Sequence, residues 1–262
     1  MAGAVAGTGT ENEAVSVAAI LQALSLPPEV RVDKRVAKKL LLEQGAPTAA
    51  DKRIIQDGVD DLHWSAALKP TNIGVHAFRD EIRDYGEIAV LTVALRPAAK
   101  ARLTELIHRA IPYPVFLVST QGETVTLTLA HKRFSQGEAG KVVLDGEMVG
   151  TTLLESALDT AFMASLALDT QAAANLYTLY QGWLERIESL AAARITGQFM
   201  PPESPERAME RRAALEEHAR LERVMVRLRS QAGKEKQLNR RVALNLEIKR
   251  LEERLNSLVN TL

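Results

Sequence analysis

The feature that most constrains this sequence is a regular stripe of aliphatic residues near its C-terminal end. Six residues alternate at spacings of four and three, which places all of them on one face of a helix, as in a coiled coil. They are Leu244, Ile248, Leu251, Leu255, Leu258 and Leu262. A similar spacing recurs from Ala214 to Leu228, and no aromatic residue follows Phe199. The C-terminal region is therefore predicted to pack helix against helix.

Two arrangements of this region fit the sequence. Ser204 followed by Pro205 is a typical helix start, because serine caps free N–H groups and proline fits the first turn. Gly233 then divides the remaining chain into halves of nearly equal length. Equal halves predict an antiparallel helical hairpin, and one continuous helix with a shifted register is the alternative.

The charged residues beside the stripe bear on how it could pair. With Leu251 at heptad position d, Glu247 falls at g and Glu252 at e, so a parallel pair would bring glutamates together. Antiparallel pairing would place Glu247 near Arg254 instead. A parallel homodimer is therefore disfavoured, and the stripe is predicted to bind a protein partner unless a hairpin closes on its own chain. The predicted helix–partner interface comprises Leu244, Ile248, Leu251, Leu255 and Leu258.

Charge is spread unevenly, although the formal net charge is zero. Residues 201–262 hold 14 Lys and Arg against 10 Asp and Glu, and the stretch from Arg223 to Arg254 holds 10 against 4. A local excess of cations attracts anionic partners whatever the average charge. Two groups of residues are therefore predicted to bind nucleic acid or an acidic partner. One lies near Gly233 and comprises Lys234, Lys236, Arg240 and Arg241; the other, at a strand end, comprises His131, Lys132 and Arg133.

Before the C-terminal region the pattern indicates strands. Residues 85–96 are rich in apolar and β-branched residues, which predicts a central strand. Further strands are predicted at 114–119, 123–131 and 141–149, with a turn at Asp145–Gly146 and a helix over 98–111. Other helices are expected over 11–24, 33–45, 48–69, from 152 onward and from 176 to about 197.

The fold class is therefore predicted to be α+β, with a mixed β-sheet core flanked by helices and a C-terminal helical hairpin or coiled coil. Residues 1–12 are expected to be a disordered N-terminus and 13–168 the α+β core domain. Residues 169–262 are expected to form a helical C-terminal region.

Known catalytic motifs are missing. The chain has no cysteine, which excludes disulfides and cysteine-based zinc sites, and its five histidines form no HExxH motif. No complete P-loop or GxSxG motif occurs either. We therefore predict no catalytic residue, metal ligand or cofactor. A divergent metal nuclease built on Glu43, Asp80, Asp84 and Glu87 with Lys132 is the weakest alternative, because no lysine follows Glu87 at the required spacing.

Membrane and export signals are also missing from the sequence. The first basic residue is Arg31, so the charged start of a signal peptide is lacking. The uncharged stretch 170–184 is too short and too polar to cross a bilayer. A cytoplasmic protein without membrane contact is expected.

Four segments together resemble an uncharacterised bacterial family, the domain of unknown function 4391, over residues 26–255. They are RVDKRVAKKLLLEQ, DLHWSAALKPTNIGV running on to EIAVLTVAL, IPYPVFLV leading to LAHKR, and KEKQLNRRVALNLEIKRLEERL. No chemistry is assigned to these segments. The resemblance implies a context, since such proteins tend to be encoded beside DNA helicases and methyltransferases in loci of antiviral-defence type. Relatives carry a proline where this chain has Ala37, which leaves a helix over 34–42 open.

The favoured function is a non-catalytic subunit that docks through its C-terminal helices on a larger DNA-processing assembly. Direct nucleic-acid binding through the basic run is the first alternative, and the metal nuclease is the second.

Overall fold

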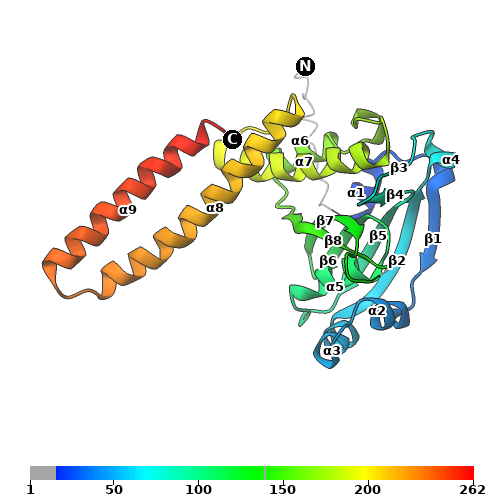
Figure 1. The fold of residues 1–262 in the computed structure, drawn as a ribbon, viewed down its shortest axis with the longest axis horizontal. Coiled ribbons are helices and arrows are strands. Elements are labelled where there is room, and N and C mark those ends of the chain that lie inside the picture. Colours follow the sequence, from blue (N-terminus) through cyan, green and yellow to red (C-terminus); the bar gives the residue numbers. More distant parts are fainter. Residues whose placement is uncertain (1–15, 139) are drawn as a thin grey trace, which may run out of the picture.

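The structure is a computed structural model that describes residues 16–138 and 140–262. It confirms the α+β class, with a mixed six-stranded sheet, helices on both of its faces and a C-terminal pair of long helices (Figure 1). The predicted disordered segment 1–12 lies outside the described residues.

The six strands lie in the order β1-β2-β5-β6-β7-β8. All neighbouring strands are antiparallel except β5 and β6, which are parallel and are joined through helix α5. A short ribbon, β3 with β4, lies beside the end of β7, where the Phe134 N–H donates to the Ile82 carbonyl at 2.7 Å. The strands are β1 (Arg31–Arg35), β2 (Val59–Leu68), β3 (Phe78–Arg79), β4 (Asp84–Tyr85), β5 (Ile88–Leu95), β6 (Val115–Gln121), β7 (Thr124–Phe134) and β8 (Val142–Thr152).

Helices cover both faces of the sheet, and this explains the continuous apolar sequence of β5. Ile88 and Val90 pack into one hydrophobic cluster, whereas Ala89, Leu91 and Val93 pack into the other. The first face is covered by α1 (Val17–Ala23), α6 (Ala157–Ala164) and α7 (Leu176–Thr196), and the second by α2 (Lys38–Gln44), α3 (Ala49–Gly58) and α5 (Arg102–Ala110). Short turns complete these layers: η1 (Pro28–Val30), α4 (Pro70–Ile73) and η2 (Leu168–Thr170).

Two helix predictions in the first third of the chain are wrong. Residues 31–35 form the edge strand β1, so α2 begins only at Lys38. The helix expected over 48–69 does begin after Thr48, whose Oγ1 accepts the Asp51 N–H at 3.1 Å, but it ends at Gly58. Residues 59–68 then form β2, since pairing with both β1 and β5 outweighs an apolar spacing that also fits a helix.

Two boundaries around β8 also differ from the prediction. The strand continues through Asp145–Gly146, where Gly146 has φ +82° in an irregularity of the β7–β8 pairing rather than a turn between strands. The next helix is capped by Ser156, whose Oγ accepts the Asp159 N–H at 3.2 Å, and not by Thr152.

The two C-terminal helices form an antiparallel hairpin that extends away from the sheet (Figure 1). We call this hairpin, α8 (Pro205–Lys234) with α9 (Leu238–Val259), the arm. The helix start at Ser204 is confirmed, and so is the hairpin, but the chain reverses at residues 235–237 and Gly233 lies inside α8. Thirty helical residues make α8 about 45 Å long.

Helix α7 belongs to the sheet core. Its buried residues Tyr180, Trp183 and Ile187 share one hydrophobic cluster with Val90 and Phe116 of the sheet. The predicted domain boundary after residue 168 stays a prediction. In the structure, the arm is the part that extends away from the sheet and its helices (Figure 1).

Candidate interaction surface

The predicted partner-binding stripe of α9 faces α8 of the same chain. Ile248 and Leu255 are each 8% exposed and cluster with Leu228 and Leu221 of α8, respectively. The other three residues are partly buried against the same clusters: Leu244, Leu251 and Leu258. The hairpin therefore covers the stripe that was assigned to a separate partner, so that assignment does not hold in this structure.

A charged contact supports the same antiparallel pairing. Arg229 of α8 donates from Nη2 to the Glu252 carboxylate of α9 at 2.8 Å. Glu252 therefore has a partner inside the hairpin. The prediction against a parallel homodimer stays a prediction.

Helix α9 carries a second apolar stripe, which sequence reasoning missed. Leu238, Val242 and Leu246 follow one another at intervals of four residues. They lie on the side of the helix opposite the stripe that faces α8, which we call the inner stripe. They are 63%, 49% and 55% exposed. The sequence contains this spacing, but the longer inner stripe runs through the same segment and gives a stronger helical pattern. We call these three residues the outer stripe.

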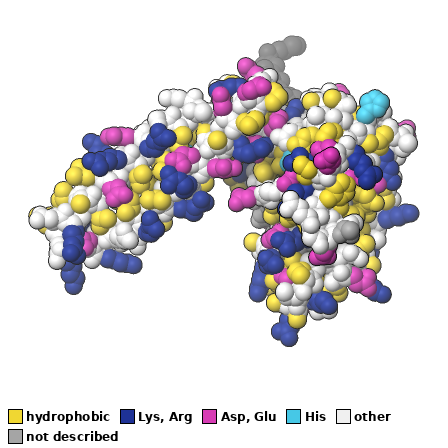
Figure 2. Space-filling view, viewed as in Figure 1, with side chains coloured by type: hydrophobic (Ala, Val, Ile, Leu, Met, Phe, Trp, Pro, Cys, Tyr) yellow, Lys and Arg dark blue, Asp and Glu magenta, His cyan; other side chains and the backbone are white. Residues whose placement is uncertain are grey.

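The arm is rich in exposed cations. All ten Lys and Arg residues from Arg223 to Arg254 are exposed, and within the described part of the chain only Arg229 of these ten makes an ion pair. Figure 2 shows cationic side chains along the arm, with hydrophobic ones between them. The four residues near Gly233 that were predicted to bind an anionic partner lie at or beside the turn of the hairpin and are exposed: Lys234, Lys236, Arg240 and Arg241. Their charges are available to an anionic partner.

The base of the arm is fixed to α7 by two neighbouring arginines. Arg212 donates to the buried Glu188 carboxylate from Nε at 2.6 Å and from Nη2 at 3.1 Å. Arg211 donates from Nη1 to Ser189 Oγ at 2.7 Å and to the Met200 carbonyl at 2.8 Å. Burial raises the pKa of Glu188, and the bond to Arg212 opposes that rise. These bonds hold α8 in one orientation on the sheet core.

The strand-end group predicted to bind anions is not an exposed patch. Lys132 is 2% exposed, and its Nζ donates to the carbonyls of His108 and of Ile111, the latter at 2.8 Å. These carbonyls lie at the C-terminal end of α5, where backbone acceptors lack helical partners. Burial lowers the pKa of Lys132 to about 7. The prediction that Lys132 meets a phosphate or an acidic partner is therefore wrong, because the side chain caps a helix inside the core.

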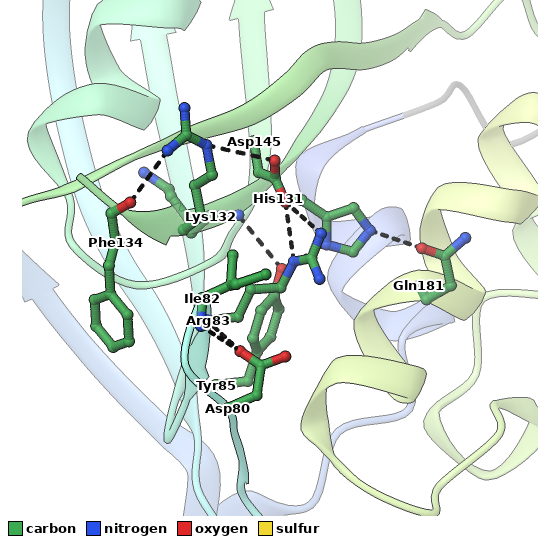
Figure 3. A network of polar contacts seen from close by, with 10 residues as sticks. Asp80, Ile82, Arg83, Tyr85, His131, Lys132, Phe134, Asp145 and Gln181 are labelled. Atoms are coloured by element: carbon green, nitrogen blue, oxygen red, sulfur yellow. Dashed lines mark hydrogen bonds and ion pairs between the residues drawn. The ribbon is translucent and has the colours of Figure 1, made fainter. Parts of the chain in front are cut away.

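His131 is also tied into the protein (Figure 3). Its Nδ1 lies 2.5 Å from Tyr85 Oη, and its Nε2 lies 2.7 Å from Gln181 Oε1. Because an amide oxygen only accepts, Nε2 carries the proton and Nδ1 accepts from Tyr85. Burial lowers the pKa of His131 to about 4, so the ring is neutral at pH 7 and joins β4, β7 and α7.

Arg133 shares a carboxylate with a second arginine. Arg83 donates to Asp145 Oδ2 from Nη2 at 2.6 Å (Figure 3). Arg133 Nε lies 3.6 Å from Asp145 Oδ1. The Arg83 guanidinium also lies over the Tyr177 ring, 5.5 Å from its centroid. These contacts fasten the β3–β4 ribbon to β8 and α7, so Arg133 serves a structural cluster here.

The carboxylates of the nuclease alternative have other partners in the structure. Glu87 pairs with Lys69 at 3.0 Å, and Asp80 Oδ1 accepts the N–H groups of Ile82 and Arg83 at 2.8 and 2.5 Å. Within residues 16–138 and 140–262, no three metal-binding side chains converge. In the same ranges, no helix is long and apolar enough to cross a membrane.

The fold and surface define an α+β protein with a projecting, cation-rich helical arm. A family model described as "Domain of unknown function (DUF4391)" matches residues 24–255. Since the match covers most of the chain, the protein belongs to this family. No curated protein and no solved structure matches the chain.

Proposed function

We propose that this protein is a non-catalytic subunit that docks on a larger DNA-processing assembly through its arm. The observation that supports this most is the two-sided character of α9. Its inner stripe is covered by α8, whereas Leu238, Val242 and Leu246 stay exposed. A helix that is apolar on two sides is typical of one with a packing partner on each.

The free energies of burial and of association show what the docking surface must include. Burial of one aliphatic side chain contributes about 1.5–3 kcal/mol. Association itself costs about 4–15 kcal/mol in lost freedom of the two partners. Three side chains therefore give weak binding at most, and the surrounding cations must add attraction to an anionic partner surface.

The DNA-processing context rests on the family resemblance. Its implied neighbours are DNA helicases and DNA methyltransferases, which are large proteins with surface for an accessory subunit. A cation-rich arm fixed at its base suits a subunit that reaches onto such a protein.

A second candidate function is direct nucleic-acid binding by the arm. It is favoured by the nine exposed cations between Arg223 and Arg254 that make no ion pair within the described residues. Phosphate contacts of this kind release counterions, so affinity for duplex DNA would fall steeply with added salt. Titration of the purified protein with duplex DNA at several salt concentrations separates this function from docking on a protein.

The docking function is tested by co-purification of the tagged full-length protein from its native organism. Mass spectrometry is expected to find a helicase or methyltransferase in a stoichiometric amount. Reversal of Lys234, Lys236, Arg240 and Arg241 to glutamate should remove it.

The matched control reverses four exposed cations of the sheet core, Lys34, Lys52, Arg53 and Lys100, and should leave the co-purified protein in place. Recovery of no DNA-processing protein, or equal recovery with both reversals, would contradict the proposal.

A further inference from the structure

We infer that the outer stripe of α9 binds an acidic amphipathic helix of the partner, laid along α9 opposite α8. This inference rests on the proposed docking function and names the chemistry of the surface that the arm recognises. It follows from the shape of the stripe, from the charges beside it and from the poor fit of two other occupants.

The shape of the stripe suits a helix. Leu238, Val242 and Leu246 extend over about 12 Å along one side of α9, which is slightly more than two turns. Apolar residues spaced by three and four on a second helix would cover such a row, as they do in helix-in-groove recognition. The inner stripe of α9 already packs in this way against α8.

The charges beside the stripe call for carboxylates on the partner. At 3.6 residues per turn, Arg241 and Arg250 fall on opposite sides of the stripe, and Lys249 follows Leu246 by one turn. All three are exposed. Glu252 lies on the same side as Arg241, but its carboxylate is bound to Arg229. Two exposed carboxylates, Glu247 and Glu253, also lie near the stripe, so the three cations outnumber them. Residues that flank an apolar helix seam select partners by opposite charge.

A second copy of this protein fits the stripe poorly. Residues 223–254 hold 10 Lys and Arg against 4 Asp and Glu. Two arms paired through their outer stripes would bring these cation-rich surfaces together, and like charges at an interface disfavour pairing. The outer stripe is therefore matched to a heterologous, acidic segment.

Binding of nucleic acid would not explain the outer stripe either. Cations alone supply phosphate contacts, so a nucleic-acid surface on the arm needs no row of exposed aliphatic residues. An acidic helix with an apolar face uses both features at once.

The inference is tested by photo-crosslinking in the native organism. The full-length chain carries p-benzoylphenylalanine at Asn245, an exposed residue beside the stripe. We expect a crosslink to a partner segment with a net negative charge and apolar residues spaced by three and four. Leu246→Asp should reduce this crosslink at least tenfold. The control Val226→Asp should not, because Val226 is 66% exposed on α8, away from α9.

Several outcomes would overturn the inference. A crosslink to a second copy, to nucleic acid or to a segment without acidic residues would each do so, as would no crosslink or one insensitive to Leu246→Asp. If a DNA-processing protein still co-purifies and depends on the four cations near the turn, the docking function survives such an outcome and only the inference fails.

Discussion

Lys132 is a buried lysine whose charge is disfavoured in the folded protein. Its pKa is about 7 when folded, against an ordinary value of 10.5. Between these two values the unfolded chain binds more protons, so the free energy of unfolding rises as the pH is raised from 7 to 10.5. We expect Lys132→Met to remove this rise and, at pH 7, to cost about 1–3 kcal/mol for the uncapped carbonyls. Urea unfolding at pH 7 and pH 9.5 measures both effects, and parallel pH dependences of the two proteins would contradict this assignment.

His131 gives a pH dependence of the same origin and sign, at lower pH. Burial lowers its pKa from 6.5 to about 4, so the unfolded chain binds more protons between these values. Stability should therefore fall as the pH drops below 6.5, by up to about 3 kcal/mol from this residue. Since burial also lowers the pKa of His108, to about 3, the native protein loses stability through both rings.

We expect His131→Gln to reduce the slope of stability against pH by about one proton between pH 6.5 and 4.5. Thermal unfolding across this range measures the slope. An unchanged slope would mean that His131 binds protons equally in the folded and unfolded chain, so that burial does not lower its pKa.

The sequence predicted the positions of these residues on β7 but not their surroundings. Val125, Leu127 and Leu129 alternate with polar residues along β7, a pattern typical of a strand with one buried face and one face in water. Helix α5 covers that face instead, so Lys132 points into a core. Alternation assigns a side chain to a face, and only the tertiary packing decides whether a helix covers it.

At the scale of elements, the joint between α7 and α8 rests on Arg212 and Glu188. Arg212→Ala would leave the buried Glu188 carboxylate without its partner. Loss of one partner of a buried pair is strongly destabilising, but Arg212 is 39% exposed, so we expect about 1–3 kcal/mol. In Arg212→Ala/Glu188→Gln the buried charge is gone, and part of the loss should be recovered. Chemical unfolding of both variants gives the comparison, and a double variant no more stable than Arg212→Ala would contradict this role.

The C-terminal helices were predictable because their apolar spacing persists over many turns. Strand β2 was not, since Leu62 and Ala66 are four residues apart and fit either a helix or a strand with an irregular pairing. That irregularity exists, because the β2–β5 register shifts between Trp64 and Ala66. The outer stripe of α9 was hidden for a related reason, as three residues give a weaker signal than the six of the inner stripe.

At the scale of the whole molecule, the sheet core and the arm have separate hydrophobic clusters and are joined by polar contacts at the base of the arm. The two large clusters of buried residues contain no residue of the arm, and the arm has two small clusters of its own. We therefore expect residues 1–200 to fold alone and to unfold in one cooperative transition, at a lower temperature than the full chain because the bonds of Arg211 and Arg212 to α7 are absent. Calorimetry of the fragment checks this, and an insoluble or unfolded fragment would show that the arm belongs to the core.

The most direct measurement is quantitative co-purification with Val242→Asp/Leu246→Asp beside Val226→Asp. All three substitutions replace exposed aliphatic residues of the arm, so circular dichroism should show unchanged helix content in both proteins. We expect at least a tenfold loss of the DNA-processing partner with the outer-stripe variant and full recovery with Val226→Asp. Equal recovery with both, while the helices stay intact, would contradict docking through the outer stripe of the arm.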